Sequence, residues 1–118
     1  MAELVAQFDI KPFPKERPRA TRNGVMYTPQ KTRDYEKQIL DLFKEQFPDH
    51  QPIVDPISVK VDIATDSIIV SVYKQDHKPK GMRGDLDNYV KAILDALNGA
   101  AWEDDRQIVL LTARKVGP

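Results

Sequence analysis

One stretch constrains the fold more than any other, residues 84–99, which read Gly-Asp-Leu-Asp-Asn-Tyr-Val-Lys-Ala-Ile-Leu-Asp-Ala-Leu-Asn-Gly. Its apolar residues recur at spacings of three and four, which predicts an amphipathic helix with one buried face. These residues are Leu86, Tyr89, Val90, Ile93, Leu94 and Leu97. Asn98-Gly99 predicts the end of the helix, because glycine after the last turn adopts a left-handed backbone without steric cost.

The polar side of this helix carries Asp87, Lys91 and Asp95, and Asp85 points the same way as Asp87 if the entry is extended. Two carboxylates and a lysine suit a metal site that acts on phosphodiesters, because Mg2+ takes carboxylate, water and phosphate oxygens. The lysine can offset charge at the scissile phosphate. The alternative is structural: Asp87 caps the helix, Lys91 and Asp95 form solvated helix pairs, and Asp85 is a turn residue. Asp-x-Asp alone does not decide between them.

The composition narrows the class of protein and of metal site. A chain of 118 residues suits one domain with one core, and no apolar run approaches the roughly 18 residues of a membrane span. The absence of cysteine excludes disulfides and thiolate metal sites, and with no signal-like N-terminus it fits a cytoplasmic protein. The two histidines, His50 and His77, lie near no other plausible ligand, so a metal here should be oxygen-ligated. His77 is close enough to the acidic stretch to be a proton shuttle, or it simply faces solvent or phosphate.

The charges are balanced in number, 18 basic against 18 acidic residues, but unevenly distributed. The first third of the chain is basic, a second basic cluster precedes Asp85, and acidic residues concentrate over 85–105. A basic surface beside an acidic pocket suits a nuclease, because phosphates need cations for affinity and carboxylates for metal-assisted chemistry. A mixed surface of salt pairs would give the same totals, so charge alone does not decide.

Residues 11–29 are rich in proline and basic residues and cannot form a regular helix or a central strand. We expect a semi-rigid basic loop, part of which forms a hairpin around Asn23-Gly24. Phe13 and Tyr27 within it either contact bases or pin the loop to the core.

The remaining pattern predicts alternating strands and helices. We expect strands over 4–10, 57–63, 68–73 and 108–116, and helices over 29–47 and 86–97. The predicted fold is therefore α/β (α+β), a single small domain over 1–118 with a mixed sheet of about four strands and two helices packed on it.

Several segments together resemble a known family. They are Gly84-Asp85-Leu86-Asp87-Asn88, Lys91, Asp95-Ala96-Leu97-Asn98-Gly99, and Trp102-Glu103-Asp104-Asp105-Arg106-Gln107-Ile108-Val109. In this order and spacing they resemble the RusA family of Holliday junction resolvases. The basic region around Arg17-Pro18-Arg19 resembles that family as well, so that the likeness runs over about 12–116 and most tightly over 84–109.

The resemblance implies an endonuclease whose catalytic segment is 84–109. Asp85, Asp87 and Asp105 would be its catalytic carboxylates and ligands of Mg2+, for which Mn2+ can substitute, and Lys91 its essential lysine. Asp104 and Asp95 are weaker candidates. The residues expected to bind DNA phosphates are Arg17, Arg19, Arg22, Lys80 and Arg83.

The resemblance also implies the partners and the setting. Family members are small homodimers, often encoded by phages or prophages, that nick opposed strands of a four-way DNA junction, so we expect a cytoplasmic protein of bacterial, phage or prophage origin. Two alternatives stay open: a DNA-binding module that holds junctions without cutting them, and a less selective metal nuclease acting on flaps or plain duplex.

Overall fold

The computed structural model describes residues 1–15 and 19–117, without the side chains of Arg19 and Ala20. The chain divides into two compact units, Met1–Asp76 and His77–Pro118. Each unit is described by itself.

The first unit is built on a three-stranded antiparallel sheet. Its strands are β1 (Leu4–Phe8), β5 (Ile68–Lys74) and β4 (Ile57–Ile63), in the order β1-β5-β4. The register pairs Ala6 with Val70, and Val70 in turn with Val61. The central strand β5 is the most buried, as expected of a strand flanked on both sides. Strand β4 forms at the predicted residues 57–63, and all of its residues are exposed.

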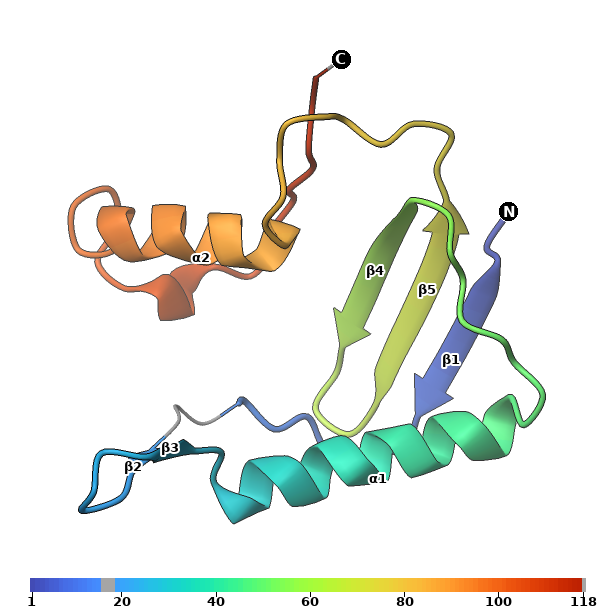
Figure 1. The fold of residues 1–118 in the computed structure, drawn as a ribbon, viewed down its shortest axis with the longest axis horizontal. Helices are drawn as coiled ribbons and strands as arrows, with labels where there is room; N and C mark the ends of the chain where they lie inside the picture. Colours follow the sequence, from blue (N-terminus) through green and yellow to red (C-terminus); the bar gives the residue numbers. More distant parts are fainter. Residues whose placement is uncertain (16–18, 118) are drawn as a thin grey trace. The chain divides into compact units, whose positions relative to one another are not determined.

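Helix α1 (Gln30–Gln46) supplies the rest of the core of this unit and lies against the end of the sheet where β1 finishes (Figure 1). Ala6, Phe8 and Ile68 form its buried centre. Partly buried apolar side chains pack against this centre. Leu4, Ile10 and Val70 come from the first strand, the segment after it and β5, and α1 with its C-cap adds Tyr35, Ile39, Leu42, Phe43 and Phe47. The helix begins one residue later than the sequence predicts, with Pro29 as its N-cap.

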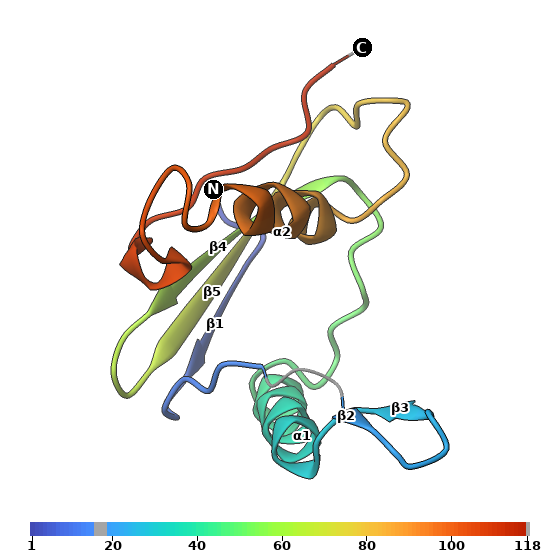
Figure 2. The ribbon, with the colours of Figure 1, turned by 90° about the vertical axis from the view of Figure 1, so that its left-hand side faces the viewer.

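The proline-rich segment forms a short hairpin, as the sequence predicts. Strands β2 (Arg19–Ala20) and β3 (Met26–Tyr27) pair antiparallel, and Gly24 turns between them with a φ of 79°. β3 leads within two residues into α1 (Figure 2). The Phe13 ring lies 5.5 Å from the Tyr35 ring, so Phe13 pins the loop to the helix, whereas Tyr27 is exposed.

The second unit contains α2 (Leu86–Leu97) and the one-turn 3-10 helix η1 (Asp105–Gln107). Asn98 is the C-cap of α2 and Gly99 follows with a φ of 82°, which confirms the predicted stop. The prediction that its apolar face is buried is wrong within this unit, because Leu86, Tyr89, Ile93 and Leu97 remain 36–59% exposed. The described residues of this unit offer the face neither a strand nor another α-helix.

The two helices and the antiparallel sheet confirm the predicted α+β fold. The predicted last strand, 108–116, is absent from the described chain, so the main sheet has three antiparallel strands where a mixed sheet of about four was expected. Val109 and Leu110 are 96% and 84% exposed. A strand needs a neighbour to accept its ladder of hydrogen bonds, and no described strand pairs with this segment. Among the described residues, no helix is long and apolar enough to cross a membrane.

Candidate functional site

Asp85 is the N-cap of α2 and has an extended backbone. Its carbonyl oxygen accepts hydrogen bonds from the backbone N–H groups of Asn88 (3.1 Å) and Tyr89 (3.2 Å). Its carboxylate makes no capping hydrogen bond, although a side-chain cap is the usual role of aspartate at this position. Because Asp85 occupies the N-cap position and Asp87 lies within the first turn, the structural alternative in which Asp87 caps the helix is wrong. The Asp85 carboxylate also forms no ion pair with a described residue, so its oxygens are available for another partner.

Asp87 and Lys91 follow on the first two turns of α2, four residues apart. Both are exposed, and within the described chain neither forms an ion pair. Asp95, a further turn along, is exposed and equally without an ion pair among those residues. The solvated helix pairs of the structural alternative are thus not formed here. Asp85, Asp87 and Lys91 give two carboxylates and an ammonium group near one end of one helix.

The segment just before Asp85 is fixed by the side chains of Tyr89 and Lys115, for which the sequence predicted no role at this site. The backbone N–H of Gly84 donates to the Tyr89 hydroxyl (3.0 Å), and the carbonyl oxygen of Gly84 accepts from Lys115 Nζ (2.7 Å). A Cβ on Gly84 would lie 3.0 Å from the Tyr89 ring, so glycine permits this approach. No spacing along the chain signals Lys115, which is 31 residues away.

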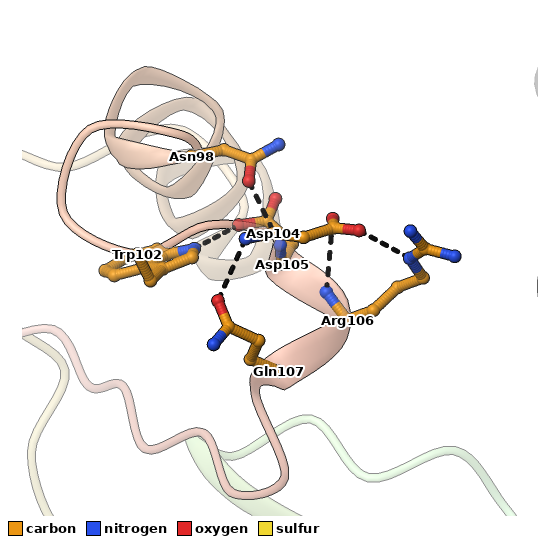
Figure 3. Close-up of polar contacts among 6 residues, drawn as sticks. All are labelled: Asn98, Trp102, Asp104, Asp105, Arg106 and Gln107. Carbon is orange, nitrogen blue, oxygen red and sulfur yellow. Dashed lines mark hydrogen bonds and ion pairs between the residues drawn. The ribbon is translucent and has the colours of Figure 1, made fainter.

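Asp105 lies in the acidic turn that follows α2. Its Oδ1 accepts a hydrogen bond from the indole Nε1 of Trp102 (2.7 Å), and its backbone N–H donates to Asn98 Oδ1 (3.0 Å) (Figure 3). Asn98 thereby joins the turn to the C-terminal end of the helix, while Trp102 orients the carboxylate. Both residues belong to the motif, but the sequence predicted for neither of them a contact with Asp105.

Asp104 has a structural role in the same turn. Its carboxylate accepts from both the guanidinium and the backbone N–H of Arg106, and Gln107 Oε1 accepts from the Asp104 backbone N–H (2.9 Å) (Figure 3). These contacts cap η1. The side-chain hydrogen bond from Arg106 is the largest of the causes that lower the pKa of Asp104 below its ordinary value of 3.8. Its partners are within the turn, which makes Asp104 a weaker candidate than Asp105 for binding a metal.

The three predicted carboxylates do not meet in this structure. Asp85 and Asp87 lie at the N-terminal end of α2, and Asp105 is tied to its C-terminal end. A helix of 12 residues is about 18 Å long. Consistently, no group of three acidic or histidine side chains that could hold a metal is found in the described residues. Asp85 and Asp87 alone fit Mg2+, which often takes only one or two carboxylates with water and phosphate, but the predicted set of three is not assembled.

The predicted phosphate-binding residues belong to both units. Arg22 is exposed in the β2–β3 turn, and Lys80 and Arg83 are exposed in the loop that leads to Asp85. Arg19 lies in β2, and Arg17 falls outside the described residues. The structure therefore locates three of these cations on exposed surface.

The histidines have other partners than the acidic residues. His77 Nε2 donates to the carbonyl oxygen of Gly117 (3.0 Å), so it fastens the C-terminal segment to the loop. The His50 ring packs edge-on against Phe43 in the first unit. Neither contact supports a proton-shuttle or ligand role.

Comparisons with known proteins agree with the motif. The model of a family described as endodeoxyribonuclease RusA matches residues 9–118. A protein of Bacillus subtilis (strain 168), named "Uncharacterized protein YqaN", is 34% identical over 116 residues, covering 89% of this chain and 81% of that relative. No solved structure matches this chain.

Proposed function

This chain belongs to the RusA endodeoxyribonuclease family, and from that premise we propose that it is a Mg2+-dependent nuclease that resolves four-way DNA junctions by paired nicks in opposed strands. The observation that carries the proposal is the start of α2, where the Asp85 carboxylate is not used to cap the helix and Asp87 and Lys91 follow on the next turns. An N-cap aspartate that leaves its carboxylate unused forgoes stabilisation of the helix. A metal-binding role for the carboxylate explains why it does not cap the helix.

The chemistry of each side chain suggests a separate role in the proposed reaction. Asp85 and Asp87 would hold the metal, and a bound Mg2+ polarises the scissile phosphate and lowers the pKa of a bound water. Lys91 would lie beside the phosphate and offset the negative charge that develops there. Asp105 remains a predicted third carboxylate, with its orientation set by Trp102. Its use at the same ion requires a different arrangement of the acidic turn and the start of α2.

Recognition of DNA would rest on phosphate contacts. Arg22, Lys80 and Arg83 are exposed, and such cations bind the backbone without reading sequence. Arg17 and Arg19 belong to the same predicted set. Selectivity for a junction would then come from the geometry of its phosphates and its deformability.

We further propose a homodimer that works in the cytoplasm. Two copies related by a two-fold axis match the approximate two-fold symmetry of a four-way junction and bring two sites to two strands. The exposed apolar residues of β4 and of α2 support an assembly, because large apolar patches on soluble proteins usually mark interaction surfaces. The absence of cysteine is compatible with a reducing compartment.

The test is cleavage of a synthetic four-way junction, labelled in turn on each strand, with Mg2+, with Mn2+ and with EDTA. Linear duplex and a flap of the same sequences serve as substrate controls, at one stated salt concentration. The proposal predicts nicks at symmetric positions in one pair of opposed strands, only with metal, and none in the duplex.

The other outcomes separate the alternatives. Junction binding without nicks under any metal condition would leave a binding module. Equal cleavage of junction, flap and duplex would leave a less selective nuclease and would contradict junction resolution.

A further inference from the structure

The C-terminal segment of the second unit is attached at both ends of α2. Asp105 donates its backbone N–H to Asn98 at the C-terminal end, and Lys115 contacts the residues just before the N-terminal end. The chain between them follows α2 as the red ribbon in Figure 1. The segment thus brings a lysine to the place where the proposed metal ligands begin.

Lys115 makes an unusual set of contacts for a lysine. Its Nζ donates to the carbonyl oxygens of Gly84 (2.7 Å) and Met82 (3.4 Å) and lies 5.8 Å from the centre of the Tyr89 ring. It is half-buried, and no carboxylate in the described chain forms an ion pair with it. Its ammonium group therefore binds backbone oxygens and lies over an aromatic face.

These contacts hold the backbone on both sides of Asp85. On the preceding side, the Gly84 carbonyl is bound by Lys115 and the Gly84 N–H by the Tyr89 hydroxyl. On the following side, the Asp85 carbonyl is bound by two N–H groups of the first turn of α2. Since both flanking peptides are fixed, the direction in which the Asp85 side chain leaves the backbone is fixed as well.

We propose that Lys115 is a positioning residue that, with Tyr89, presents the Asp85 carboxylate for metal binding. The proposal rests on the proposed function for the role of Asp85, but its geometry lies wholly within the second unit. Groups that orient a metal ligand are commonly needed for affinity even though they never touch the metal. Lys115 would act in this way through the Gly84–Asp85 peptide.

The test measures Mg2+ binding directly, by titrating the 15N-labelled full chain with MgCl2 and following the backbone amide signals of Asp85 and Asp87. Lys115→Met removes the donors and keeps most of the length of the side chain, and Lys115→Arg keeps donors and charge. Lys44→Met, at an exposed lysine of α1, is the matched control. Junction binding without metal and nicking with Mg2+ are measured on the same samples.

In Lys115→Met we expect the apparent Kd for Mg2+ to rise by about tenfold or more, with the nicking curve shifted to higher Mg2+ by the same factor. Lys115→Arg keeps a donor for the Gly84 carbonyl, and Lys44→Met changes a residue of the other unit. The Kd of both variants should therefore stay within about twofold of that of the unmodified protein. Metal-free junction binding should not change. A Mg2+ affinity unchanged in a folded Lys115→Met variant, or an equal loss in Lys115→Arg, would overturn the proposal.

A second variant covers the case in which Lys115→Met does not fold. Tyr89→Phe keeps the ring and removes only the hydroxyl that accepts from Gly84. It should weaken Mg2+ binding in the same direction, and an unchanged Kd would overturn the positioning role. If the unmodified protein binds Mg2+ through Asp85 but nicks no junction, the proposed function fails while the positioning of Asp85 is still tested by the titration.

Discussion

The indole Nε1 of Trp102 and the Oδ1 of Asp105 are 2.7 Å apart, in a hydrogen bond between two half-buried side chains. The bond lies within a turn of four residues, and the Asp105 backbone is fixed separately by Asn98 (3.0 Å). The carboxylate therefore has one oxygen bound to the indole and a defined orientation. The Trp102 indole thus orients a carboxylate that is predicted to be catalytic.

Replacing Trp102 by phenylalanine keeps an aromatic ring and removes the donor. If the orientation of Asp105 matters for cleavage, nicking of a four-way junction should fall about tenfold, since a hydrogen bond to a charged group contributes about 1.5 kcal/mol or more. Glu103→Gln, at the exposed neighbouring acid, should leave the rate unchanged. Full activity of a folded Trp102→Phe variant would show that this bond serves only the turn.

Asp104 gives a prediction that depends on pH. Because Arg106 holds the pKa of Asp104 below 3.8, the contact stabilises the fold above that pH and is lost as the pH falls through the lowered pKa. We expect the side-chain 13C signal of Asp104 to titrate below 3.8 in the intact protein. In Arg106→Gln the midpoint should move up towards 3.8, and an unchanged midpoint would contradict the contact.

Gly84→Ala tests the close approach of Gly84 to Tyr89. The new Cβ would lie 3.0 Å from two carbons of the ring, but the ring is 40% exposed and can shift. We expect a loss of about 1 kcal/mol in the free energy of unfolding, at the low end of overpacking costs, measured by urea denaturation. The loss should vanish when the same change is made in a Tyr89→Ala background. A loss of equal size in both backgrounds would assign it to the backbone instead of the ring.

The core of the first unit can be tested separately. Phe8 is 4% exposed and belongs to the buried cluster of β1, β5 and α1. Phe8→Ala should reduce the free energy of unfolding by about 3 kcal/mol or more, because it leaves a cavity. Val54→Ala, at a side chain 93% exposed, should change it by no more than about 0.5 kcal/mol. Similar losses for the two variants would contradict the packing of α1 on β1.

Local pattern predicted most of the elements because their signals are local. Alternation located β4, the spacing of apolar residues located α1 and α2, and Asn98-Gly99 marked the end of α2. The prediction of the last strand was wrong because a strand also depends on contacts that are not local. Residues 108–116 have strand-like composition, but a strand exists only where a neighbour pairs with it, and sequence pattern does not report the neighbour.

In the candidate site too, the sequence predicted what depends on local spacing and missed what depends on contacts between distant segments. The motif identified Asp85, Asp87 and Lys91, whose spacing on one helix fixes where they lie relative to one another. It did not reveal that Asp105 is tied to the other end of that helix, which depends on a hydrogen bond to the Asn98 side chain. Nor did it reveal Lys115, whose role depends on the path of a segment without regular structure.

The most direct test of the central claim is the rate of Mg2+-dependent nicking of a labelled four-way junction by Asp85→Asn. Asp66→Asn, in the exposed turn between β4 and β5, is the control for the loss of one carboxylate. The account predicts paired nicks by the unmodified protein and by Asp66→Asn, and none by Asp85→Asn, with junction binding retained in all three. Nicking by Asp85→Asn at the unmodified rate would contradict the assignment of the start of α2 as the catalytic centre.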